Sequence, residues 1–184
     1  MKMMAAGIGR YTGKSAAVYR CPSDRALSAA QRNAGWRHRV RSYSMNAMLG
    51  DAGTATQSGV NENNDEYVQF FKYSSIPQPS EIFVFLDEHP DSIDDGYFLN
   101  SPRQGYWRDL PASFHQDGTS FAFADGHSEL HVWRGSTLRV PAEPFAIQRP
   151  VRLKVGEGRY EDLKDFSWII SAMSIPRNPG TYHY

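Results

Sequence analysis

The sequence is almost without cysteine, has no excess of charge and contains no long apolar run. Cys21 is the only cysteine among 184 residues, so no internal disulfide can form, and its thiol is expected to be a small buried apolar group. The formal net charge is +0, which argues against a partner attracted by overall charge, such as DNA or an anionic membrane. No run approaches the ~20 apolar residues that span a bilayer, and no signal peptide is visible. The chain as printed is therefore expected to be water-soluble.

The composition is that of one folded domain over residues 1–184. Hydrophobic residues make up 40% of the chain and aromatic residues 13%, which is enough for a core. No internal repeat and no linker divides the sequence.

A hairpin is predicted around Asp125-Gly126, the residue pair that a two-residue type I′ turn prefers. That turn would place Ala124 opposite His127 and Phe121 opposite Leu130. Side chains alternate along a strand, so each strand contributes to two faces. The expected apolar face carries Phe121, Phe123, Leu130 and Val132. The expected polar face carries Ser120, Ala122, Ala124, His127, Glu129 and His131.

The remaining elements predict an α+β fold. Residues 82–86 form an unbroken apolar run, typical of a central strand that is covered on both faces. Residues 162–173 carry a one-sided apolar stripe and predict a helix. Residues 1–13 predict a short helix, and residues 16–20 a short extended segment. The expected fold is an antiparallel sheet built on the 82–87 strand and the 119–133 hairpin, with helices near both ends.

Five segments, in order, resemble one bacterial family. His115 stands nine residues before Asp125-Gly126, which is similar to the H-x9-DG signature of type II secretion pseudopilin-like proteins, abundant in Planctomycetes and Verrucomicrobia. The other four segments resemble the family's CPSD, SYxMN, PSE…FLDE and D-x-x-W motifs. They are Cys21-Pro22-Ser23-Asp24, Ser42-Tyr43-Ser44-Met45-Asn46, Pro79-Ser80-Glu81 with Phe85-Leu86-Asp87-Glu88, and Asp165-Phe166-Ser167-Trp168.

The resemblance implies a pilin-like globular head that is structural and non-catalytic. In the family, an apolar N-terminal helix packs into a filament core, and this chain lacks that helix. The expected partners are other pilin-like subunits or secretion-system proteins, with no nucleic acid, and the membrane is reached only through the missing helix. The expected location is the cell envelope, in the periplasm or on the cell surface. No cofactor is expected.

A metal-dependent hydrolase is the alternative hypothesis. Asp87 ends the predicted central strand, while His115 and Asp125 flank the first strand of the hairpin. Carboxylate and imidazole together suit zinc, manganese or iron, and a bound water could then be activated. The structural alternative is that Asp125 caps its own turn and His115 bonds the backbone or Asp87.

Two binding hypotheses concern aromatic and basic residues. Residues 25–41 combine five arginines with Trp36, a pattern that nucleic-acid sites use, although arginines in a neutral chain can simply pair with carboxylates. Exposed tryptophans could stack on glycans. Those considered are Trp36, Trp107 and Trp133.

Overall fold

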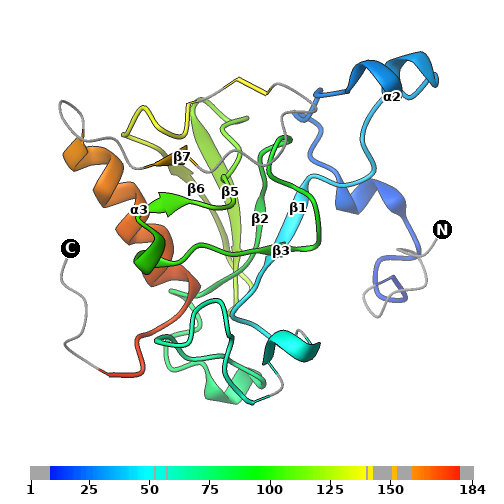
Figure 1. Ribbon diagram of the computed structural model, residues 1–184. Helices are drawn as coiled ribbons and strands as arrows, with labels where there is room; N and C mark the ends of the chain where they lie inside the picture. The colour runs from blue at the N-terminus through cyan, green and yellow to red at the C-terminus, as the bar shows by residue number, and fades with distance from the viewer. Residues whose placement is uncertain are drawn as a thin grey trace.

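A five-stranded sheet forms the centre of the molecule, with strand order β3-β1-β2-β5-β6 (Figure 1). This computed structural model describes residues 9–51, 53–56, 58–139, 141–142, 151–152 and 159–178. The strands of the main sheet are β1 (Tyr43–Asn46), β2 (Phe83–Asp87), β3 (Tyr97–Phe98), β5 (Gly118–Phe123) and β6 (Ser128–Val132). β3 is parallel to β1, and the other neighbours are antiparallel. The predicted α+β class is confirmed at this level.

Smaller elements surround the sheet. A second sheet pairs β4 (Tyr106–Trp107) with β7 (Val151–Arg152). The α-helices of the described residues are α2 (Ala29–Asn33) and α3 (Arg159–Met173). The 3-10 helices are Ala16–Tyr19, Gly53–Thr56, Tyr73–Ser75 and Pro102–Gln104. Neither α2 nor α3 has the length and apolar content of a bilayer-spanning helix.

β2 is the central strand, as its apolar run predicts. Both faces of the strand were expected to be covered because of this run, whereas the structure shows a bulge within the strand. Phe83 pairs with Phe123, whereas Phe85 pairs with Ala122, so the register shifts between them. A bulge rotates the following residues by one position. Phe83 and Leu86 are therefore both buried in the core, while Phe85 lies on the other face and is only partly buried.

The β5–β6 hairpin exists, but its predicted register is wrong by one residue. Phe121 lies opposite Glu129, and the Gly126 amide donates to the Phe123 carbonyl at 3.0 Å. Gly126 has a φ of 97°, while Asp125 is not among the residues with positive φ, so the loop is not a type I′ turn. A three-residue loop closed by a glycine replaces it.

The shifted register exchanges the faces of β6. Leu130 and Val132, predicted to be in the core, are 48% and 50% exposed. His131 instead lies on the side of Phe121, where its ring stacks on Trp168 of α3 with centroids 3.7 Å apart. A slip of one residue moves every side chain of a strand to the opposite face, which accounts for both differences.

α3 covers one face of the sheet, as Figure 1 shows. Its buried stripe of Phe166, Ile169, Ile170 and Met173 packs into a single core cluster with Phe83 and Phe121. Asp165 fixes the helix to the end of β6, because its Oδ2 accepts hydrogen bonds from the amides of Arg134 (3.0 Å) and Gly135 (2.7 Å). The predicted helix at 162–173 is confirmed and begins three residues earlier.

The N-terminal segment lies on the opposite side of the sheet from α3 (Figure 1). Residues 9–14 form turns, and the rest of the helix predicted at 1–13 falls outside the described residues. Residues 16–19 form a 3-10 helix, so the predicted extended segment at 16–20 is wrong. The segment joins the sheet where the Ser42 amide donates to the Tyr19 carbonyl at 2.9 Å.

Candidate functional site

Three chemically reactive side chains meet at one end of β2. The Nε2 atom of His115 lies 3.4 Å from the Cys21 Sγ and 3.3 Å from the Asp87 Oδ2. One possible ligand atom from each of the three residues lies within 4.8 Å of those of the other two. The residues are far apart in sequence, and each belongs to a segment that carries the family resemblance. The site is therefore assembled by the tertiary fold.

Asp87 and His115 are placed by the ends of two neighbouring strands. Asp87 is the last residue of β2, opposite Tyr43 of β1. His115 begins a tight turn, in which the His115 amide donates a hydrogen bond to the Gly118 carbonyl at 3.2 Å. Gln116 and Asp117 have φ of 54° and 62°, so this turn holds both central residues in the left-handed region. The turn leads directly into β5, which pairs with β2, and so brings the imidazole to the carboxylate.

Cys21 is held in place by the buried carboxylate of Asp24. This carboxylate accepts hydrogen bonds from the Ser42 hydroxyl at 2.7 Å and from the Arg39 guanidinium at 3.0 and 2.5 Å. The Asp24 amide in turn donates to the Cys21 carbonyl at 3.1 Å. Asp24 thus fastens the loop that contains Cys21 to the start of β1.

The site is crowded with acidic groups and short of positive charge. Burial raises the pKa of Asp87, and the charge of His115 opposes this shift. Burial and the charge of Asp87 raise the pKa of the Cys21 thiol. The same two causes, together with the neighbouring Cys21, raise the pKa of Tyr43 to about 12. A thiol with a raised pKa loses its proton less readily, and a bound cation would favour the thiolate form.

Asp125 does not join this cluster. β2 and β5 run antiparallel, and Asp125 follows the end of β5 that lies beside Phe83, at the opposite end of β2 from Asp87. Its Oδ1 accepts a hydrogen bond from the His127 amide at 3.1 Å and lies 2.6 Å from the His127 Nδ1. The predicted set of Asp87, His115 and Asp125 is therefore wrong in its third member, and Asp125 caps its own turn beside Gly126.

Cys21 is the member that sequence reasoning missed. As a lone cysteine it was expected to be a structural thiol. The available signal was that Cys21, Asp87 and His115 each stand in a separate segment of the family resemblance. Spacing along the chain could not show that the three segments converge.

Two of the three tryptophans considered for glycan stacking are buried, whereas Trp36 is 47% exposed, and two arginines of the basic stretch make contacts within the protein. Trp107 and Trp133 are 0% exposed, so neither can stack on a glycan. In the basic stretch, Arg39 pairs with Asp24, and Arg41 donates to the Asp95 carbonyl. These arginines serve contacts within the protein, as the structural alternative expects.

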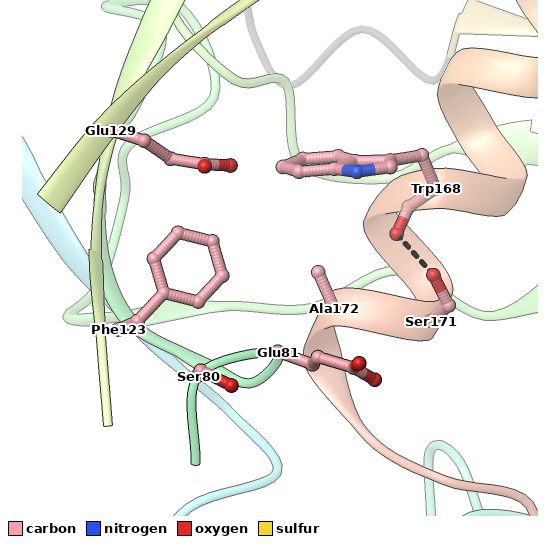
Figure 2. A pocket seen from close by; sticks show the side chains of 7 residues that line it. All are labelled: Ser80, Glu81, Phe123, Glu129, Trp168, Ser171 and Ala172. Carbon is pink, nitrogen blue, oxygen red and sulfur yellow. Dashed lines mark hydrogen bonds between the residues drawn. The ribbon is translucent and has the colours of Figure 1, made fainter. Parts of the chain in front are cut away.

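Two hollows flank the sheet. A pocket of about 260 Å³ opens between the hairpin and α3, where Figure 2 shows Phe123, Trp168 and Ala172 between the carboxylates of Glu81 and Glu129. A larger groove of about 700 Å³ lies on the opposite face. Its apolar floor includes Met45, Phe85, Tyr97 and Ala122.

The groove ends close to the Cys21–Asp87–His115 cluster. Tyr43, which borders the groove, pairs with Asp87 across the β1–β2 ladder. Thr12, Val18 and Tyr19 form the wall contributed by the N-terminal segment. Residues 9–19 therefore lead to the apolar face that α3 leaves uncovered.

Comparisons with models of protein families, with curated proteins and with solved structures found no match to this chain.

Proposed function

We propose that this chain is the globular head of a pseudopilin or type IV pilin-like subunit, a structural protein of the cell envelope that assembles with other pilin-like subunits or secretion-system proteins. The observation that carries the proposal is the apolar groove on the sheet face opposite α3. Its occupant in the assembled protein is the apolar N-terminal helix of a pilin-like subunit. An apolar helix suits this groove because most of its lining is apolar, with Met45, Phe85 and Ala122 among the residues, and Arg41 is the one charged residue among the described residues that line it.

The position of the N-terminal segment supports this occupant. Val18 is 48% exposed, although it lies at the edge of the groove, so an apolar side chain stands uncovered there. A patch of several uncovered apolar side chains on one face is typical of a contact surface. The chain passes along this face before it enters the sheet.

Scaffold roles of the motif residues also support a structural subunit. The Asn46 Nδ2 donates to the carbonyls of Phe83 (2.9 Å) and Met173 (2.8 Å), and its Oδ1 accepts from the Met48 amide at 3.0 Å. One buried side chain thus joins β1, β2 and the end of α3. Two residues likewise join α3 to β6: Asp165 accepts a hydrogen bond from the Gly135 amide, and Trp168 stacks on His131. Such residues maintain the relative positions of elements, as expected of a structural subunit.

Photocrosslinking in the source cells tests the proposed function. A photoreactive benzoylphenylalanine at Phe85 is expected to crosslink to the N-terminal helix of a pilin-like subunit, in an envelope fraction. The matched control places the same group at Phe71, which is 45% exposed and does not line the groove. The proposed assembly would be refuted if the Phe85 variant did not crosslink to a pilin-like helix, or if the Phe71 variant gave the same product.

The isolated chain offers a second test. Assembly driven by such a helix predicts that the described head, expressed without an apolar N-terminal helix, stays monomeric in light scattering. Filaments formed by this chain alone would contradict helix-driven assembly.

A further inference from the structure

We propose that Cys21, Asp87 and His115 form a binding site for one divalent transition-metal ion of the zinc type. This inference is independent of the assembly role, since it concerns only the end of β2. It replaces Asp125, predicted from the sequence, with Cys21.

The spacing of the donor atoms fits a tetrahedral metal. Metal–ligand distances of about 2.3 Å for sulfur and about 2.0 to 2.2 Å for nitrogen and oxygen imply separations of about 3.6 Å for S···N and about 3.4 Å for N···O. The observed values are 3.4 Å between the Cys21 Sγ and the His115 Nε2, and 3.3 Å between that nitrogen and the Asp87 Oδ2. These two separations match tetrahedral coordination, and the third, between Cys21 and Asp87, lies within 4.8 Å.

The Asp87 carboxylate is a buried acidic group. Its side chain is 1% exposed, and the His115 Nε2 lies 3.3 Å from its Oδ2. Burial of a charged carboxylate opposes folding unless nearby groups or ions compensate its charge. The nearby ring nitrogen of His115 compensates part of this charge, and a cation bound by all three residues would compensate it further.

The geometry distinguishes a metal site from a catalytic triad. In a triad the thiol and the carboxylate contact different nitrogens of the imidazole, so that the carboxylate orients the ring. Here both contact the same atom, Nε2 of His115, which can carry only one proton. A metal ion coordinated by all three satisfies each donor at once.

The donor set selects the class of metal. Thiolate, imidazole and carboxylate together suit zinc, whereas magnesium and calcium prefer oxygen ligands alone. The His115 side chain is 30% exposed, so solvent can supply a fourth ligand. The three ligands come from the N-terminal loop, the end of β2 and the turn before β5, and the ion would therefore also tie these segments together.

Cobalt(II) provides a direct spectroscopic test with the full chain. One equivalent of Co²⁺ is expected to produce a thiolate-to-cobalt charge-transfer band, because Cys21 is the only cysteine and thus its only possible source in the protein. Competing Zn²⁺ should abolish the band, and Zn²⁺ should protect the single thiol from alkylation, measured by intact mass. Wild-type protein that gives no band and no protection would overturn the proposal.

Matched variants locate the site. Cys21→Ser should abolish the band, and His115→Gln and Asp87→Asn should weaken Zn²⁺ binding by at least about 100-fold, more than is usual for an outer-shell residue. Asp125→Asn is the control and should bind as the wild type does, because Asp125 lies at the other end of β2. Circular dichroism establishes that each variant is folded. If a variant does not fold, zinc protection of the wild-type thiol still tests the site, because it needs no substitution. Unchanged binding in His115→Gln, or lost binding in Asp125→Asn, would overturn the assignment.

Discussion

Protonation of His131 is expected to weaken the contact between the hairpin and α3. Burial, with a smaller contribution from the charge of Arg134, lowers the pKa of His131 from 6.5 to about 4. The ring is stacked on Trp168, at 3.7 Å between centroids and 18° between planes. Since the folded state binds this proton less tightly than the unfolded chain, stability is lost as the pH falls from about 6.5 towards about 4.

The expected magnitude follows from the two pKa values. Their full difference corresponds to about 3 kcal/mol, and only part of it is reached at about pH 5. The ring is partly exposed, so solvent screening reduces the effect further, to about 1 to 2 kcal/mol between about pH 7.5 and about pH 5. His131→Phe keeps an aromatic ring against Trp168 but cannot take up a proton.

Urea unfolding, followed by tryptophan fluorescence at several pH values, measures the effect. The wild type should lose about 1 to 2 kcal/mol more than His131→Phe over this pH interval. The exposed His38 serves as the control, because His38→Gln should follow the wild-type pH dependence. Parallel stability curves for the wild type and His131→Phe would refute the reasoning.

Two further substitutions test the packing around the sheet. Burial raises the pKa of Asp109 to about 7, so its ionisation opposes folding as the pH rises from about 4 through 7. Asp109→Asn, whose side-chain oxygen can still accept from the Leu99 amide, should therefore lose about 2 to 3 kcal/mol less than the wild type between about pH 5 and about pH 8 in urea titrations. Asp165→Ala leaves the amides of Arg134 and Gly135 without their acceptor and should destabilise the protein by about 2 to 3 kcal/mol. Asp165→Asn, which keeps one acceptor oxygen, should lose less in the same thermal melt, and equal losses in the two variants would contradict this role.

The elements of the fold could be predicted because each has a local signal. The apolar run at 82–86 and the one-sided stripe at 162–173 identify β2 and α3 directly. The register of the hairpin could not be obtained in the same way. Asp125-Gly126 fits both a two-residue and a three-residue loop, and the choice depends on which side of β6 packs on α3. The stacking of His131 on Trp168 makes that choice, and it involves residues far apart in the sequence.

The candidate site was predictable only in part for the same reason. Asp87 and His115 were expected to meet if β5 lay beside β2, and it does. Cys21 could not be placed, because its position depends on Asp24 bonding to Ser42 and Arg39 across the start of β1. Each of these bonds joins segments that are separated by other elements of the chain. A cysteine without a recognisable partner in sequence is therefore easily assigned to the core.

The motif residues divide into two groups according to the face of the sheet that they serve. Asn46, Asp165 and Trp168 hold α3 and the core on one side. Cys21 and His115 meet Asp87 at the other side, next to the groove. The second group gathers an imidazole, a thiol and a buried carboxylate at one point, with the His115 Nε2 3.3 Å from the Asp87 Oδ2 and 3.4 Å from the Cys21 Sγ. The first group thus supports the proposed structural head, and the second is the basis of the proposed metal site, so the two proposals rest on different residues.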